Sequence, residues 1–168
     1  GRFVLFPNAG GLAQGGADAG FADVDDDGRA DVLIASASGT HGLFLNDAER
    51  GFTRSADSIR GVGPVAVGDY DNDGGLDFYV GGTGLWRNNG SGRFTRDSRS
   101  RIASRAGGEA QFFDYDNDGW LDLLLVNDAG ASLLHNNKEG RFEDRTALLP
   151  KGRLVPPVVI SDLDGDGD

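Results

Sequence analysis

Short apolar runs alternate with glycine- and aspartate-rich turns along the chain. Three runs of β-favouring residues are distinctive because each directly follows an acidic loop, at residues 32–35, 78–80 and 123–126. No segment shows the sustained three-to-four-residue spacing of apolar positions that marks an amphipathic helix. Short runs of branched, aromatic and leucine residues between turn residues are typical of strands. The pattern therefore predicts an all-β protein.

Two further marks recur and divide the chain into repeats. A short apolar strand ending in asparagine follows each complete loop, at residues 43–46, 85–88 and 133–136. A glycine and a phenylalanine come next, and we expect them to open the first strand of the following repeat, as at Phe94–Arg96. The repeats are then residues 1–50, 51–91 and 92–139, with an incomplete fourth at 140–168. Four short strands in roughly 40 to 50 residues are typical of a β-propeller blade. Residues 1–168 are thus predicted to form a partial β-propeller of about three and a half four-stranded blades, each with a metal loop.

Each repeat carries a nine-residue loop with aspartate at positions 1, 3, 5 and 9 and glycine at position 6. The aspartates of the three complete copies are Asp23, Asp25, Asp27 and Asp31; Asp69, Asp71, Asp73 and Asp77; and Asp114, Asp116, Asp118 and Asp122. A fourth copy begins with Asp162, Asp164 and Asp166. A single Asp-Gly pair is an ordinary turn signal, but three complete copies in phase favour a shared chemical role.

The chemistry that this loop favours is calcium binding. Ca²⁺ takes about six to eight oxygen ligands, and aspartates at alternate positions of a tight loop can aim several carboxylates at one centre. Without a cation, carboxylates this close would repel one another. We expect the backbone carbonyl of position 7 to add an oxygen, from Arg29, Gly75, Trp120 and Asp168.

An EF-hand is the first alternative for such a loop. It shares the early aspartates and the glycine, but it needs an acidic residue at position 12 and flanking helices. Position 12 is Ile34, Val80 or Leu125, and each lies in a predicted strand. The EF-hand interpretation is therefore rejected.

The loop phrases resemble FG-GAP/VCBS repeats, most closely the ASPIC/UnbV and CRTAC-like branch, and more distantly the integrin α-subunit propeller. The resemblance rests on residues 67–80 and 85–94 and extends over essentially the whole chain. It implies a propeller of about seven or eight blades, with calcium between the first two strands of each blade. It also implies an extracellular, cell-surface or periplasmic location. The Phe-Gly and Gly-Ala-Pro signatures of the integrin type are absent.

Composition narrows the possible partners. The formal net charge is −11, which argues against nucleic-acid binding. No run is long enough to span a membrane, and no signal peptide is visible in this segment. The chain contains neither cysteine nor methionine. We expect it to be an excerpt whose remaining blades come from the rest of a longer chain or from another copy.

Other charged residues give weaker indications. The arginines Arg87, Arg93, Arg96, Arg99, Arg101 and Arg105 suggest either an anion site or, as we prefer, a solvated loop. His135 shares its register with Leu45 and Arg87, which favours an ordinary half-exposed strand position.

The function that these observations favour is a calcium-binding extracellular module for protein or glycan interaction or adhesion. A catalytic carboxylate pair is disfavoured, because a reaction needs one such site and these loops repeat. The alternative is the propeller portion of a secreted carbohydrate-active enzyme such as a polysaccharide lyase. An appended catalytic domain in the full reading frame would favour that alternative.

Overall fold

Twelve strands form three four-stranded antiparallel sheets in the computed structural model, which describes residues 18–36, 38–57, 59–100, 102, 108–151, 157–158 and 160. The first sheet contains β1 (Asp18–Ala22), β2 (Asp31–Ala35), β3 (Gly42–Asp47) and β4 (Gly51–Arg54). The second contains β5 (Val65–Gly68), β6 (Asp77–Val80), β7 (Gly84–Asn88) and β8 (Phe94–Arg96). The third contains β9 (Glu109–Phe113), β10 (Asp122–Asn127), β11 (Gly130–Asn136) and β12 (Phe142–Asp144). The predicted all-β, partial β-propeller fold is confirmed.

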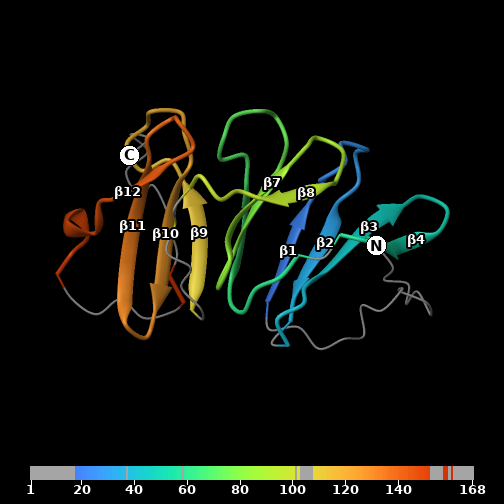
Figure 1. The fold of residues 1–168 in the computed structure, drawn as a ribbon, viewed down its shortest axis with the longest axis horizontal. Coiled ribbons are helices and arrows are strands. Elements are labelled where there is room, and N and C mark those ends of the chain that lie inside the picture. The colour runs from blue at the N-terminus through green and yellow to red at the C-terminus, as the bar shows by residue number, and fades with distance from the viewer. Residues whose placement is uncertain are drawn as a thin grey trace.

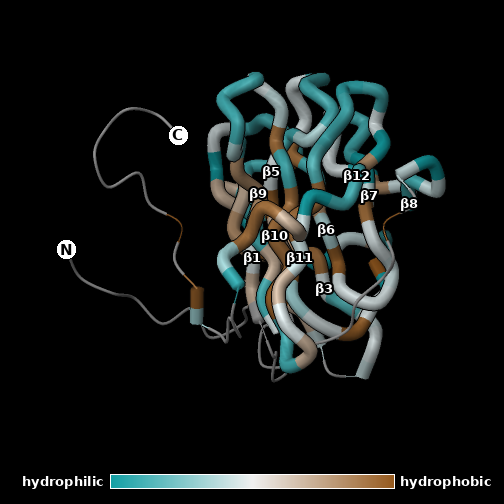
Figure 2. The backbone as a smooth tube through the Cα atoms, turned by 90° about the vertical axis from the view of Figure 1, so that its left-hand side faces the viewer, coloured by the Kyte–Doolittle hydropathy of each residue, from teal (hydrophilic) through white to brown (hydrophobic). Residues whose placement is uncertain are grey.

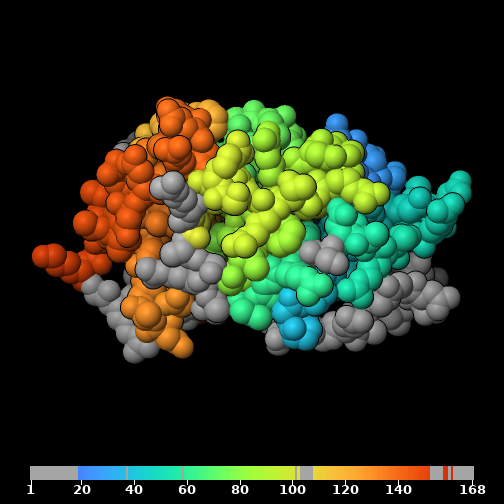
Figure 3. Space-filling model, in the orientation of Figure 1, coloured from blue at the N-terminus to red at the C-terminus, as the bar shows by residue number. Residues whose placement is uncertain are grey.

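The sheets stand side by side like consecutive blades, with the second sheet between the first and the third (Figure 1). Their first strands contact one another, β1 with β5 and β5 with β9. The space-filling view shows the same order as three adjoining bodies, coloured blue to cyan, green to yellow, and orange (Figure 3). The chain therefore advances by one sheet per repeat, as a propeller requires.

Two apolar layers fill the spaces between neighbouring sheets. One layer joins the first and second sheets and includes Leu33, Leu43 and Phe78. The other joins the second and third sheets and includes Tyr79 and Leu123, both fully buried. Phe78 and Tyr79 are neighbours in β6 and point to opposite faces of the sheet, as the two-residue period of a strand dictates. The middle sheet is thus covered on both faces, which explains why its central strand is apolar at every position after Asp77.

The glycine–phenylalanine segments do not open the following repeats, so that expectation is wrong for the described copies. β4, β8 and β12 are instead the fourth strands of the sheets that precede them. A short turn joins β7 to β8 and is closed by a hydrogen bond that Asn89 N donates to Arg93 O at 3.0 Å. Such short links favour antiparallel neighbours. The link from β8 to β9 is longer, at residues 97–108. The sheets therefore span residues 18–54, 65–96 and 109–144, one strand out of phase with the sequence repeats.

Helical structure among the described residues is limited to a three-residue 3-10 turn, η1 (Thr146–Leu148), and no helix there could span a membrane. Ile34, Val80 and Leu125 lie in β2, β6 and β10, so the rejection of the EF-hand is confirmed for these three loops.

Candidate metal centres

The three complete aspartate loops lie at the same edge of the molecule. Loop 1 (residues 23–31) joins β1 to β2, loop 2 (residues 69–77) joins β5 to β6, and loop 3 (residues 114–122) joins β9 to β10. Figure 1 shows all three at the top of the sheets, and Figure 2 shows that this edge is hydrophilic. Equivalent loops share an edge because each follows the first strand of its sheet. The fourth loop, with Asp162, Asp164, Asp166 and Asp168, lies outside the described residues.

The position 1 carboxylate shapes each loop by accepting two backbone hydrogen bonds. In loop 1, Asp27 N donates to Asp23 Oδ1 at 3.0 Å and Gly28 N donates to Asp23 Oδ2 at 2.7 Å. Asp69 and Asp114 accept the equivalent pairs at 2.8–3.1 Å. Aspartate is favoured in turns because its short side chain can bond to backbone N–H groups a few residues ahead. The first aspartate is therefore a structural part of the turn.

Two positions of each loop adopt the left-handed backbone conformation. Position 6 is glycine, with φ of 83°, 89° and 83° in the three loops, as the sequence leads us to expect. Position 4 also has positive φ, at Asp26 (59°), Asn72 (53°) and Asn117 (54°). Asparagine and aspartate are the side-chain-bearing residues that enter this region most readily. The sequence signal for position 4 was present in this restriction to Asp and Asn, and our sequence reasoning missed it.

The position 9 aspartates are buried at the start of β2, β6 and β10, and each ties its loop to the sheet. In loop 2, Asp77 accepts hydrogen bonds from Tyr70 N at 3.3 Å and from Asn88 N at 2.8 Å. Asp31 and Asp122 accept the equivalent two bonds at 2.7–3.1 Å. Both backbone N–H groups that surround this carboxylate would otherwise be buried without a partner.

Burial has an electrostatic consequence at position 9. It raises the pKa of Asp77 to about 7, and it also raises the pKa of Asp31 and of Asp122. Low-dielectric surroundings disfavour the charged form of a carboxyl group. A divalent cation in the loop would favour the ionised form of all three.

The position 3 aspartates of loops 1 and 2 each carry one oxygen that lacks a hydrogen-bond donor, while the other oxygen of Asp71 pairs with Arg87 Nε at 2.6 Å. Asp25 Oδ1 and Asp71 Oδ1 are buried and accept no hydrogen bond from the residues that the structure describes. Burial and the neighbouring loop carboxylates raise the pKa of both groups. A buried carboxylate oxygen is normally hydrogen-bonded, and one without a donor costs free energy. A cation that prefers oxygen ligands, one in each loop, would give each of these atoms a partner. The residues of both loops therefore fit a calcium ion.

The position 5 aspartates are each paired with a basic side chain. Asp27 pairs with Arg29, Asp73 with Arg87 at 2.8 Å, and Asp118 with Lys138 at 3.1 Å. The second carboxylate oxygen accepts the N–H of position 7 at 2.9 Å in every loop. These partners orient the carboxylate, as the outer shell of a metal site does. The sequence analysis did not identify these three basic side chains as partners of position 5.

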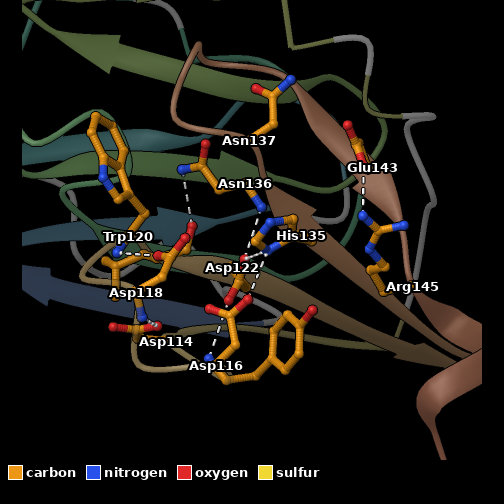
Figure 4. Close-up of polar contacts among 12 residues, drawn as sticks. Asp114, Asp116, Asp118, Trp120, Asp122, His135, Asn136, Asn137, Glu143 and Arg145 are labelled. Atoms are coloured by element: carbon orange, nitrogen blue, oxygen red, sulfur yellow. Dashed lines mark hydrogen bonds and ion pairs between the residues drawn. The ribbon is translucent and has the colours of Figure 1, made fainter.

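The loop carboxylates converge in groups whose ligand atoms lie within 4.8 Å of one another. These groups are Asp23, Asp25 and Asp27 in loop 1; Asp69, Asp71 and Asp77 in loop 2; and Asp114, Asp116 and Asp118 in loop 3. A fourth group joins Asp116 and Asp122 to His135 (Figure 4). This histidine occupies the partly buried strand position in β11 that its register predicts, and from there it also contacts loop 3. The proposed carbonyl ligands at Arg29, Gly75 and Trp120 stay predictions.

Asparagines at the ends of β7 and β11 connect each loop to the loop of the preceding sheet. Asn88 Nδ2 donates to Leu76 O in its own loop at 3.1 Å and to Val24 O in loop 1 at 2.8 Å. Asn136 Nδ2 repeats the arrangement with Leu121 O at 3.2 Å and Tyr70 O in loop 2 at 2.7 Å. Both asparagines are buried. Neighbouring loops are therefore bridged by buried hydrogen bonds.

The arginine-rich stretch is divided among separate partners. Arg93 pairs with Asp57 at 3.4 Å, and Arg99 pairs with Asp97 at 3.1 Å. Arg96 Nε donates to Thr83 O at 2.8 Å. Arg101 and Arg105 lie outside the described residues. The described arginines thus bond within the protein, which supports the solvated-loop interpretation over an anion site.

Comparison with known proteins agrees with this repeat geometry. A family model described as FG-GAP-like repeat matches residues 23–80 and 114–168. The two matched segments contain loops 1, 2 and 3 and together cover more than half of the chain. No curated protein matches the sequence.

Proposed function

Because the chain belongs to the FG-GAP-like repeat family, we propose that its three described loops bind calcium and that bound calcium stabilises the propeller. The observation that carries the proposal is the pair of buried, unpartnered oxygens, Asp25 Oδ1 and Asp71 Oδ1. Calcium would be held by the aspartates at positions 1, 3, 5 and 9 and by the carbonyl of position 7. When bound, it supplies positive charge to a cluster of carboxylates that otherwise repel one another.

Thermal unfolding in EDTA, calcium and magnesium tests this proposal. We expect the midpoint to be highest in calcium, since a ligand that binds the folded state alone stabilises it by about 2.7 kcal/mol at a hundredfold excess over its dissociation constant. Magnesium should substitute poorly, because it demands stricter octahedral geometry. Calorimetric titration of the metal-free chain should give at least three calcium ions per chain. Equal midpoints in the three conditions would contradict the proposal.

We further propose that the module acts outside the cytoplasm as a surface for protein or glycan partners. FG-GAP repeats occur mostly in extracellular or surface proteins, and the family assignment is the support for this location. The ASPIC/UnbV and CRTAC-like branch stays a prediction, since the matching family model is described as FG-GAP-like repeat and names no branch. Binding to immobilised glycans and extracellular-matrix proteins, compared in calcium and EDTA, tests the interaction role. Capture that is equal in both conditions would separate partner binding from the calcium loops.

We assign no catalytic role to the described acidic residues. Loops 1, 2 and 3 repeat one structural arrangement, and in each the first and ninth aspartates are held by backbone N–H groups. Turnover of a polysaccharide by the purified chain, abolished by one substitution outside the loops, would favour the enzyme alternative.

A further inference from the structure

Loop 3 differs from the other two because a histidine stands beside its carboxylates. His135 lies on β11, and its Nδ1 is 3.1 Å from Asp122 Oδ1 and 3.5 Å from Asp116 Oδ2 (Figure 4). The equivalent residue beside loop 1 is Leu45, which has no ligand atom, and beside loop 2 it is Arg87, whose guanidinium is always charged. Loop 3 is therefore the described loop in which nitrogen and oxygen ligands converge.

Two of the three groups, Asp122 and His135, are held in place by the surrounding structure. Asp122 is 0% exposed, and backbone N–H groups of Tyr115 and Asn136 fix its two oxygens at 3.1 and 2.8 Å. The His135 side chain is 16% exposed, and its ring meets the edge of Tyr115 with the ring centroids 5.7 Å apart. Asp116 is more exposed and leaves one side of the cluster open to solvent. Ligands that are already oriented lose little entropy when a metal binds.

The ligand set indicates a different metal from that of an all-oxygen loop. Imidazole suits zinc, copper, iron and nickel, whereas calcium selects oxygen. Ligand atoms bonded to one zinc ion at about 2.0–2.2 Å stand roughly 3 to 3.5 Å apart. His135 Nδ1 stands at 3.1 Å from Asp122 Oδ1 and at 3.5 Å from Asp116 Oδ2, and the three ligand atoms lie within 4.8 Å of one another. We propose that His135 Nδ1, Asp116 and Asp122 form a binding site for a transition-metal ion of the zinc class.

This site overlaps the calcium site of loop 3 and leaves the other loops untouched. Asp116 belongs both to the oxygen cluster with Asp114 and Asp118 and to the mixed cluster with His135. Zinc and calcium would therefore compete for loop 3 alone. Zinc binding by the mixed cluster does not depend on calcium binding at loops 1 and 2, so each proposal can fail without the other.

Calorimetric titration of Zn²⁺ into the metal-free chain, repeated with calcium added as a competitor, tests the site. We expect one zinc ion per chain, with an affinity that falls by about 100-fold in His135→Leu, since loss of even an outer partner costs 10–100-fold in metal affinity. Leucine is the residue that loop 1 carries at this register, so the fold accommodates it. A calcium-dependent melting curve like that of the wild type shows that the variant is folded. Equal zinc affinity in the two proteins, or no zinc binding by the wild type, overturns the proposal.

A measurement on the unmodified protein provides a second test. The chain contains two histidines, and the other, His41, is 1% exposed and belongs to none of the ligand groups found among the described residues. In ¹⁵N-labelled protein, zinc should shift the Nδ1 resonance of His135 and leave both ring nitrogens of His41 unchanged. An unshifted His135 Nδ1 at saturating zinc would show that the ion binds to aspartates alone and would overturn the proposal.

Discussion

The unpartnered oxygen of Asp71 makes this residue the sharpest test of calcium binding at a single position. Asparagine has nearly the same shape but no charge, so Asp71→Asn removes the attraction for a cation while keeping the packing. In saturating calcium we expect a loss of up to about 2.7 kcal/mol, the stabilisation from one site at hundredfold excess. In EDTA the loss should be smaller, because burial and the neighbouring Asp73 and Asp69 disfavour the charged form, and what remains is the ion pair of Asp71 with Arg87 Nε at 2.6 Å. Chemical unfolding in both conditions measures the difference.

Asp26→Asn is the matched control for this substitution. Asp26 occupies position 4 of loop 1, where φ is 59° and asparagine is as well tolerated as aspartate. The equivalent residues of loops 2 and 3 are already asparagines, Asn72 and Asn117. Stability should be unchanged with or without calcium. Equal losses in Asp71→Asn and Asp26→Asn would show that position 3 has no special role.

His41 should make the protein sensitive to mild acid. Its Nδ1 accepts a hydrogen bond from Ser36 N at 2.9 Å, and burial lowers its pKa. The unfolded chain therefore binds a proton below about pH 6.5 that the folded chain resists. Stability that is complete above this pH falls as the pH drops toward the folded pKa, by up to about 1.4 kcal/mol per pH unit. Urea unfolding between about pH 7.5 and 5.5 in saturating calcium measures this loss.

His41→Asn isolates the contribution of the histidine. Asparagine offers an oxygen to Ser36 N and does not titrate in this range. The variant should therefore lose less stability on acidification than the wild type. If the two proteins lose the same amount, the acid sensitivity belongs to other groups and the interpretation of His41 is wrong.

At the element scale, the asparagine at or next to the end of the third strand of a sheet should contribute more to the free energy of unfolding where it bridges two loops. Asn88 donates to one carbonyl in loop 1 and one in loop 2, and it also accepts a hydrogen bond from Gly90 N at 3.1 Å. Asn88→Ala removes the partner of the buried Val24 O and of two partly buried groups, at about 1–3 kcal/mol for a buried unsatisfied group. Asn46→Ala is the control, because Asn46 Nδ2 donates to Ala30 O of its own loop, in a more exposed position. Urea unfolding should show a larger loss for Asn88→Ala, and equal losses would contradict the bridging role.

The strands could be predicted from their repeated apolar runs. The pairing of some strands and the side chains that contact the loops could not. Residues 32–35, 78–80 and 123–126 lie in β2, β6 and β10 as their apolar runs indicate. The wrong sheet assignment of Phe94 arose because sequence periodicity fixes the length of a repeat but not where a sheet begins. A short turn decides that pairing, and it could have been read from the asparagines and glycines at residues 88–92.

The basic side chains that pair with position 5 show a second limit of prediction from sequence. Arg29 lies in its loop, Arg87 lies in a strand and Lys138 lies in the turn after a strand, yet each pairs with the same loop position. No common spacing connects the three, so a repeat pattern could not reveal them. The strand position predicted for His135 is confirmed, but its contact with loop 3 was missed, because Leu45 and Arg87 at the same register give no sign of it. Side-chain reach in three dimensions, not register alone, determines these contacts.

For the whole molecule, calcium should change the electrophoretic behaviour strongly. The formal net charge is −11, and three bound divalent ions would bring it to −5 by adding six positive charges. Migration toward the anode should therefore slow by roughly half in calcium compared with sodium at equal ionic strength. Capillary electrophoresis measures this directly. A chain that migrates equally in the two salts, with its melting curve also unchanged, would argue against multiple bound ions.

The buried asparagine bridges give the row of loops a property that no single loop has. Val24 and Tyr70 stand at position 2 of loops 1 and 2, and each is bonded to an asparagine that also braces the next loop. An ion that orders one loop therefore fixes one boundary of its neighbour, and the neighbour has less disorder to lose when its own ion arrives. Binding of an ion in one blade then favours binding in the adjacent blade, as in a one-dimensional lattice with nearest-neighbour coupling. For the proposed calcium sites we therefore expect a saturation curve steeper than that of independent sites, so that the three described loops fill together over a narrow range of calcium concentration.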